Sequence, residues 1–199
     1  MSQRIGVLNV QGAVSEHATQ LRRIGAEVQL VRHPEDLEGL AGIVLPGGES
    51  TTIGKLLKKY GLFEPLRNRI AEGMPVFGTC AGMILLAERI LGDDDPHLAV
   101  MDVTVDRNSF GRQRESFEAN VPIADIEGDP FPGVFIRAPH IVDVSSSVRV
   151  LAEIDGKIVA ARQGQMLATA FHPELTDDLR LHSYFSEMVS AGCYVSATS

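Results

Sequence analysis

The sequence predicts an α/β protein with three layers: a mostly parallel central sheet, helices on both faces, and a small antiparallel extension. Two observations lead to this prediction. In the first half of the chain, short apolar runs typical of strands buried on both faces alternate with segments of helical periodicity. Such alternation implies parallel strands joined by right-handed crossovers. In the second half, short strand candidates are separated by Gly, Pro and Asp, which is typical of strands joined by turns.

The first half opens with an apolar run at residues 4–10, which predicts a buried strand. Residues 14–24 then carry apolar side chains at helical spacing and stop at Gly25, a plausible helix end. After the third strand comes a tight glycine loop, and Ser50 or Thr51 can cap the helix that follows it. The other elements expected here are strands at residues 27–31 and 42–45, a helix from the cap toward Tyr60, a helix at 63–72, a strand that leads into Cys80, and a helix at 83–90.

The second half predicts mainly strands and one closing helix. The expected elements are strands at residues 100–106, 117–121, 133–136 and 148–154, a hairpin made by residues 157–162 and 166–171, and a helix at 179–191. The chain contains no internal repeat, low-complexity tract or clear linker. We therefore expect residues 1–199 to form a single domain with a flavodoxin-like fold.

Charge and cysteine content restrict the classes of function. A net charge of −8 and an isoelectric point near 5.2 argue against a general affinity for nucleic acid or for anionic membranes. No apolar run is long enough to span a bilayer, and the N-terminus leads directly into a strand, which leaves no room for a signal peptide. Cys80 and Cys193 lie too far apart in sequence to indicate a disulfide framework. The expected location is the cytoplasm, where thiols stay reduced.

The most informative stretch is residues 74–86, in which a short apolar run leads to Gly78-Thr79-Cys80-Ala81-Gly82. This pattern predicts a strand, a sharp turn and a helix, with Cys80 at the apex and small residues where the backbone is crowded. The amides and the positive dipole end of the helix would favour the thiolate, the reactive form of cysteine. Taken alone, the motif is equally compatible with a small cysteine buried in the core.

A second stretch, His172-Pro173-Glu174, places a carboxylate two residues after a histidine at the end of a predicted strand. A cysteine nucleophile needs a base for its proton, and that base needs an orienting acceptor. In extended backbone, residues two apart point the same way, so Glu174 can bind one ring nitrogen of His172 while the other faces Cys80. By itself the tripeptide also fits an exposed histidine and a solvated glutamate.

The third stretch, residues 46–50, places two glycines directly after a strand. Glycines let backbone amides approach a ligand closely, as an oxyanion hole requires, and the amide of Ala81 is the natural second donor. A plain glycine turn is the alternative. Ligands gather at the carboxyl ends of parallel strands, where Gln11, this loop and Cys80 are all expected.

Longer strings extend these motifs. Gly78-Thr79-Cys80-Ala81-Gly82 with a downstream His-x-Glu resembles class I (triad-type) glutamine amidotransferases. The combined strings resemble the family of glutaminase subunits of pyridoxal 5'-phosphate synthase over nearly the whole chain. These strings are Gly6-Val7-Leu8 with Gln11-Gly12-Ala13, Leu45-Pro46-Gly47-Gly48-Glu49-Ser50-Thr51-Thr52, Arg107-Asn108-Ser109-Phe110-Gly111-Arg112-Gln113, Phe135-Ile136-Arg137-Ala138-Pro139-His140, and Phe171-His172-Pro173-Glu174-Leu175.

The resemblance implies hydrolysis of L-glutamine to L-glutamate and ammonia through a cysteine thioester. Cys80 would be the nucleophile, His172 the general base and acid, and Glu174 the residue that orients His172. The carried-over oxyanion donors are Gly48 and Ala81, and the carried-over substrate-binding residues are Gly48, Glu49, Ser50, Arg107, Ile136 and Arg137. The two arginines suit the charged or polar α-amino acid end of glutamine, and the Glu49 carboxylate suits its ammonium group. Gln11 would couple the oxyanion loop to a partner.

The implied partner is a separate synthase chain with a (β/α)8-barrel fold, which forms large rings and uses the ammonia to make pyridoxal 5'-phosphate. The glutaminase itself would need no cofactor and no metal. Two other classes of function remain: a different cysteine hydrolase such as a peptidase, and a non-catalytic binding module. Fold alone would not separate the three, because function depends on the site.

Overall fold

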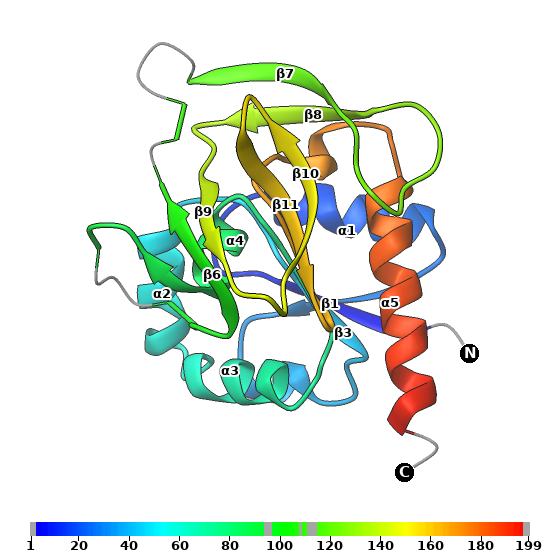
Figure 1. Ribbon diagram of the computed structural model, residues 1–199. Coiled ribbons are helices and arrows are strands. Elements are labelled where there is room, and N and C mark those ends of the chain that lie inside the picture. The colour runs from blue at the N-terminus through cyan, green and yellow to red at the C-terminus, as the bar shows by residue number, and fades with distance from the viewer. Residues whose placement is uncertain (1–2, 94–96, 108, 111–114, 197–199) are drawn as a thin grey trace.

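The computed structural model describes residues 3–93, 97–107, 109–110 and 115–196, with side chains as far as residue 192 (Figure 1). The elements in chain order are β1 (Arg4–Leu8), α1 (Val14–Arg23), β2 (Glu27–Val31), η1 (Pro34–Leu37), β3 (Gly42–Leu45), α2 (Ser50–Lys59), α3 (Phe63–Ala71), β4 (Val76–Thr79), α4 (Ala81–Leu86), β5 (Ala87–Ile90), β6 (Met101–Asp106), β7 (Ser116–Val121), β8 (Phe131–Ile136), β9 (His140–Val144), β10 (Arg149–Ile154), β11 (Lys157–Gln163), β12 (Met166–Thr169), η2 (Pro173–Leu175) and α5 (Arg180–Ser196).

Five strands pair in parallel in the order β2-β1-β3-β4-β12. This is the strand order of flavodoxin-like sheets, so the predicted fold is confirmed. β3 and β4 are buried along their whole length, as expected for strands covered on both faces. Because these strands are parallel, the segments that follow β1, β3, β4 and β12 emerge at one edge of the sheet.

The antiparallel extension is also confirmed. β11 pairs antiparallel with β12, β9 and β10, β9 pairs antiparallel with β6, and β5 closes this side of the sheet parallel to β6. β7 and β8 form a separate two-stranded antiparallel sheet, drawn at the top of Figure 1. The sequence does not predict β9, because its only fully buried residue is Ile141 and the rest of the strand has no apolar alternation.

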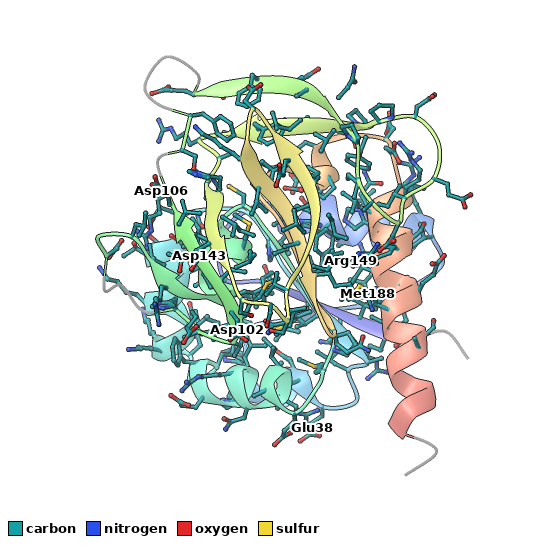
Figure 2. All side chains as sticks on the ribbon, in the orientation of Figure 1. Glu38, Asp102, Asp106, Asp143, Arg149 and Met188 are labelled. Carbon is teal, nitrogen blue, oxygen red and sulfur yellow. The ribbon has the colours of Figure 1, made fainter. Side chains whose placement is uncertain are left out.

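Helices cover both faces of the parallel strands. α1 packs beside α5 on one face, and α2, α3 and α4 lie on the other (Figure 1). The side chains of β4 alternate between these layers: the Phe77 ring contacts the rings of His182 and Phe185 in α5, whereas Gly78 faces α4. Met188 of α5, labelled in Figure 2, is buried against the sheet. Within the described part of the chain, no helix is both long and apolar enough to cross a membrane.

Two local predictions are wrong. The predicted helix at residues 83–90 ends at Leu86, and Ala87–Ile90 form β5 instead. Ala87 and Ile90 are the buried residues of this segment, a spacing of three that also fits a helix, but the segment pairs with β6. The cap of α2 is neither Ser50 nor Thr51, since both lie inside the helix.

The actual cap of α2 is Glu49. Its carboxylate accepts hydrogen bonds from the amide of Thr51 at 3.1 Å and from the amide of Thr52 at 2.7 Å. The glutamate side chain therefore binds the two amides that a serine or threonine at the cap position would bind. Smaller differences concern ends of strands: β1 stops at Leu8 and β12 at Thr169, each two residues before the predicted end.

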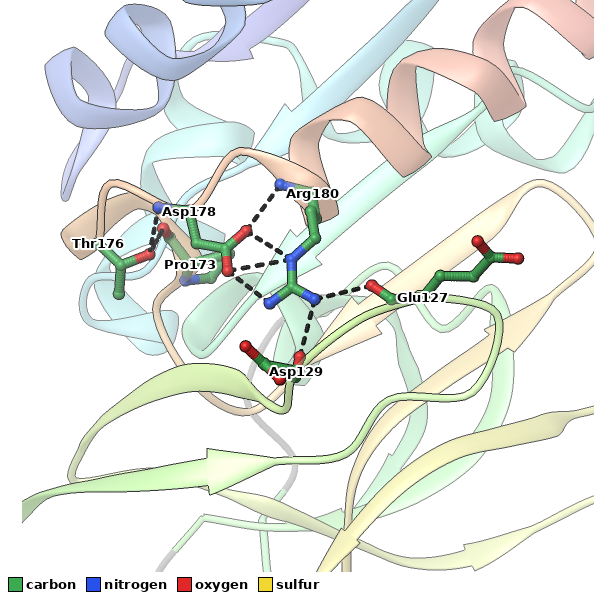
Figure 3. Close-up of polar contacts among 6 residues, drawn as sticks. All are labelled: Glu127, Asp129, Pro173, Thr176, Asp178 and Arg180. Carbon is green, nitrogen blue, oxygen red and sulfur yellow. Dashed lines mark hydrogen bonds and ion pairs between the residues drawn. The ribbon is translucent and has the colours of Figure 1, made fainter.

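Arg180, in the first turn of α5, joins two distant segments (Figure 3). Its guanidinium donates to the carbonyl oxygens of Glu127 at 2.9 Å and Asp129 at 2.8 Å, in the loop before β8. It also binds the Asp178 carboxylate, at 2.6 Å for the shortest contact, and lies 5.8 Å from the centre of the Phe131 ring. These contacts fix the segment that follows η2 against the two-stranded sheet.

Replacing Arg180 by Ala should lower the free energy of unfolding by about 1–2 kcal/mol, because a charged donor with several partners is lost. The hydrogen bonds from Arg180 lower the pKa of Asp178 in the folded protein. The stabilisation is therefore present above the pKa of an unfolded aspartate, about 3.9, and is lost as the pH falls through the lower folded value. Urea unfolding of both proteins should show a difference that shrinks below about pH 4.

The matched control is Arg67→Ala, which removes an exposed arginine that lies 4.0 Å from Glu64. This variant should stay within about 0.5 kcal/mol of the wild type, as is usual for surface ion pairs. An Arg180→Ala protein as stable as the Arg67→Ala control would contradict the assigned role of Arg180.

Candidate active site

Cys80 stands at a strained turn between β4 and α4. Its backbone has φ 51° and ψ −104°, which a non-glycine residue adopts only when its surroundings impose it. The Cys80 amide donates to Thr169 O at 2.8 Å. Gly78 and Gly82 pack against each other below the turn, since a Cβ on Gly78 would lie 2.6 Å from the carbonyl carbon of Gly82. The predicted strand, turn and helix are thus confirmed, and the thiol is raised at the edge of the sheet.

His172 and Glu174 follow β12 and form a hydrogen-bonded pair. The His172 amide donates to Val134 O of β8 at 2.8 Å, which fixes the backbone at this point. The Nδ1 atom of His172 lies 2.6 Å from Glu174 Oε1. Both side chains are buried, with 7% of His172 and 4% of Glu174 exposed. The alternative of an exposed histidine and a solvated glutamate is therefore wrong.

The protonation of His172 reflects this environment. Burial opposes a charge on the imidazole, but hydrogen bonds with Cys80 and Glu174 and the negative charge of both partners outweigh it and raise the pKa of His172 to about 10. A buried imidazolium flanked by a sulfur and a carboxylate is the arrangement of an activated cysteine with an orienting acid.

The glycine loop between β3 and α2 passes directly over His172. A Cβ on Gly47 would lie 2.3 Å from Cε1 of the His172 ring, so only glycine allows this approach. The loop is held from the side of α1: Ala13 N donates to Gly47 O at 3.0 Å, and Glu49 N donates to Gln11 Oε1 at 2.8 Å. No hydrogen bond of the Gly48 or Ala81 amide is found among the described residues.

A cavity of about 450 Å³ opens over Cys80, a volume within the range of small-molecule pockets. The segment after β8 closes one side, where Ile136 O lies 3.9 Å from the Cys80 sulfur and Arg137 turns the chain with φ 44°. The cavity is lined by Gly12, Ala13, Gly47, Gly48, Glu49, Ser50, Cys80, Ala81, Ile84, Arg107, Ile136, Arg137, His172 and Leu175.

The lining of the cavity therefore contains every predicted site residue except two. Glu174 is not part of the lining because it lies behind His172, as an orienting residue must. Gln11 holds the glycine loop through Glu49 N and does not line the cavity. The sequence-based prediction misses Ala13, although the string Gln11-Gly12-Ala13 marks this segment.

Two charged side chains of the cavity have partners within the protein. The Glu49 carboxylate caps α2 and also accepts from the Thr52 hydroxyl at 2.6 Å. Partial burial acts to raise the pKa of Glu49, but the hydrogen bonds from Thr52 and Thr51 outweigh it and lower the pKa. Arg107 lies 2.6 Å from Asp93 Oδ2 and 3.1 Å from Thr51 Oγ1. Both groups are thus held as fixed charges on one side of the cavity.

The described residues contain no group of three or more His, Cys, Asp or Glu side chains that could hold a metal ion. Cys80 is a free thiol, and the side chain of Cys193 lies outside the described part of the chain.

The family model and the similar proteins agree on the family of this chain. A model of the SNO glutamine amidotransferase family matches residues 7–191. The pyridoxal 5'-phosphate synthase subunit PdxT of Geobacillus kaustophilus is 62% identical over 186 residues, which cover 94% of each chain. The protein of the same name from Carboxydothermus hydrogenoformans is 56% identical, with 95% of this chain and 99% of the relative covered.

Solved structures agree. A crystal structure described as a glutamine amidotransferase superposes with a TM-score of 0.89 at 48% identity, covering 94% of this chain and 98% of the other. A putative GMP synthase protein from Thermoplasma acidophilum shares the fold, with a TM-score of 0.71 at 18% identity and coverage of 99% and 98%.

The titration of His172 tests the site geometry. In histidine ring nitrogen NMR spectra, His172 should stay protonated through neutral pH and lose its proton near pH 10. His182, whose pKa burial lowers to about 4, should stay neutral over the same range and serves as an internal control. In a Cys80→Ala variant the His172 transition should move to lower pH, because the hydrogen bond and negative charge of Cys80 are removed. A wild-type transition near the ordinary value of about 6.5 would contradict the geometry.

Proposed function

The chain belongs to the SNO glutamine amidotransferase family, and from this premise we propose that it hydrolyses L-glutamine and supplies the ammonia to a partner synthase that makes pyridoxal 5'-phosphate. The observation that carries the proposal is the placement of Cys80 and His172 at one cavity, with Glu174 bound to His172 from the side away from the cavity. Relatives that are 56% and 62% identical carry the name of a pyridoxal 5'-phosphate synthase subunit. The family model covers most of residues 1–199, which supports a single glutaminase domain.

The reaction follows from the order of the three side chains. The Cys80 sulfur, whose proton is already held by His172, attacks the side-chain amide carbon of glutamine. His172 then gives a proton to the amide nitrogen, the carbon–nitrogen bond breaks, and ammonia leaves behind a thioester on Cys80. His172 next takes a proton from water, which attacks the thioester and releases glutamate and the Cys80 thiol. Glu174 orients the imidazole through Nδ1 and stabilises its positive charge.

Gly48 and Ala81 are the proposed oxyanion donors. Both line the cavity next to Cys80, and Ala81 begins α4, where first-turn amides have no partner within the helix. The tetrahedral intermediate places a negative charge on the former amide oxygen, and two preorganised N–H donors stabilise that charge.

The substrate-binding residues are proposed to be Gly48, Glu49, Ser50, Arg107, Ile136 and Arg137, all of which line the cavity. Arg107 and Arg137 supply positive charge for the α-carboxylate of glutamine, and the ionised Glu49 supplies negative charge for its α-ammonium group. Glu49 does so while it caps α2, which keeps its carboxylate in place without substrate.

The proposed partner is a synthase chain of (β/α)8-barrel form that receives the ammonia. Gln11 and Ala13 connect the start of α1 to the glycine loop, so a partner bound at this end can position the oxyanion donors. Because an oxyanion hole acts mainly on the transition state, such a partner should raise the turnover rate more than the substrate affinity. A reactive thiol requires a reducing compartment, which supports a cytoplasmic location.

Glutamate release from glutamine should be slow for the chain alone and should rise when the matching synthase is added, mainly through kcat. Cys80→Ala should lose at least about a thousandfold in both conditions, because the nucleophile is absent. Activity that does not depend on the synthase would point to another ammonia acceptor. No activity of the wild type in either condition would contradict the proposed function.

Arg107→Met should raise KM for glutamine by roughly ten- to a hundredfold while kcat changes little, because a charge-assisted bond to the carboxylate is lost in ground and transition state alike. The control is Arg149→Met in β10, an arginine outside the cavity that pairs with Asp125 at 2.7 Å (Figure 2). The Arg149→Met control should have the same KM for glutamine as the wild type. An unchanged KM in a folded Arg107→Met protein would exclude Arg107 from the binding site.

A further inference from the structure

Three polar side chains with no exposed surface lie behind Glu174, on the side away from the cavity. They are His17 of α1, Thr79 of β4 and His182 of α5, and each is 0% exposed. The three elements meet where α1 and α5 pack side by side on the face of the sheet opposite α4 (Figure 1). None of these residues lines the cavity. Since burying polar groups is unfavourable unless they bind one another, the cluster calls for a physical explanation.

The contacts form a chain that ends at Glu174. His17 Nδ1 lies 2.9 Å from His182 Nε2, and His17 Nε2 lies 3.0 Å from Thr79 Oγ1. The same Nε2 atom lies 3.4 Å from Glu174 Oε2. That oxygen accepts no well-aligned hydrogen bond from any described residue, whereas Glu174 Oε1 is bound to His172. His17 thus faces the one carboxylate oxygen that the His172 pair leaves unused.

Chemistry decides which nitrogen of His17 carries the proton. If Nδ1 carried it, the bare Nε2 lone pair would face the negative Glu174 oxygen, and the proton of His182 would lie on Nδ1, which has no partner among the described residues. If Nε2 carries it, His182 Nε2–H donates to His17 Nδ1, and His17 Nε2–H is shared between the Thr79 hydroxyl and Glu174. The second arrangement keeps a lone pair from facing Glu174, and it leaves His182 Nδ1 as an unpaired acceptor instead of an unpaired donor, so it is the favoured tautomer.

We propose that His17 is a positioning residue for the glutaminase reaction: its Nε2–H holds Glu174 Oε2, and so keeps Glu174 Oε1 on His172. The inference rests on the proposed function only in naming that reaction. Hydrogen bonds of catalytic groups are often long without substrate and shorten in the complex with substrate or in the transition state. The 3.4 Å contact is therefore the substrate-free form of a bond that shortens when glutamine binds.

The electrostatics support a neutral donor at this place. Burial, together with the neighbouring charges of His182 and His172, lowers the pKa of His17 well below its ordinary value. The titratable groups that face His17 are His172 and Glu174 around η2 and His182 of α5. A neutral His17 gives Glu174 an N–H dipole without adding a second positive charge beside His172.

The test compares two substitutions at one position in a Cys193→Ser background, in which Cys80 is the only thiol. His17→Leu removes the donor, and His17→Gln restores an N–H near the position of Nε2. We expect His17→Leu to lower kcat for glutamine by roughly ten- to a hundredfold with KM within about threefold, and His17→Gln to recover most of the loss.

The second measurement is the rate of Cys80 alkylation by iodoacetamide as a function of pH. In His17→Leu the midpoint of the profile should move to higher pH by about one unit, because a less stabilised Glu174 carboxylate supports the imidazolium less well. In His17→Gln it should stay near the wild-type value. Alkylation needs no glutamine, so this result stands even if the chain proves to have no glutaminase activity.

The control for a simple loss of packing is Leu21→Ala, which empties a fully buried position of the same helix. It should lower the melting temperature without moving the alkylation midpoint. The proposal is overturned if folded His17→Leu keeps the wild-type kcat and midpoint. It is also overturned if a folded His17→Gln protein loses as much kcat as His17→Leu. The same holds if Leu21→Ala moves the alkylation midpoint as far as His17→Leu does.

Discussion

The contact between Gly78 and Gly82 is the constraint on which the rest of the site depends. Because Gly78 has no Cβ, α4 can start directly above β4, and because Gly82 has none, this helix can also lie against Leu45 O of β3. Cys80 has φ 51° at the apex between the two glycines. The amide of Cys80 is then held by Thr169 O, the last residue of the neighbouring strand, so the turn and the end of β12 cannot move independently. The chain that continues from β12 carries His172 and Glu174. The close packing at these two glycines and the bond to Thr169 O therefore place Cys80 beside the start of the segment that carries His172.

The parts of the fold that can be predicted correctly from the sequence are those determined by neighbours along the chain. The parallel strands, the turn at Cys80 and the pair His172–Glu174 all follow from spacing within a few residues. The errors arise where a partner far along the chain decides between two compatible states. Residues 87–90 have an apolar spacing that fits a helix, but they pair with β6; β9 has a single fully buried residue, and its pairing with β6 and β11 defines it. Glu49 caps α2 because the glycine loop brings its carboxylate back onto the helix.

The same distinction holds for the site. Motifs in the sequence suffice to place Cys80, Gly48, Ala81 and the two arginines at the cavity, since each belongs to a string that has a meaning of its own. His17 cannot be placed in this way, because its partner His182 is 165 residues away and neither residue belongs to a motif that indicates chemistry. Ala13 is an intermediate case. Its neighbours Gln11 and Gly12 mark the segment, but only the fold shows that the Ala13 amide holds Gly47 O and thereby the loop above His172.

The buried charge of Glu174 connects these findings. A carboxylate with 4% exposure is unfavourable unless a positive group or several donors compensate it, and His172 is the nearest group that can become positive. The ion pair between the two residues therefore has two effects: it compensates the buried carboxylate of Glu174, and it raises the pKa of His172. If His17 became protonated, it would compete with His172 for Glu174 and repel the charge on His172. Burial of the His17 and His182 rings away from solvent keeps them neutral, as their lowered pKa values indicate. Of these three imidazoles, His172 beside Cys80 is thus the one that carries a proton charge at neutral pH, and His17 and His182 stay neutral.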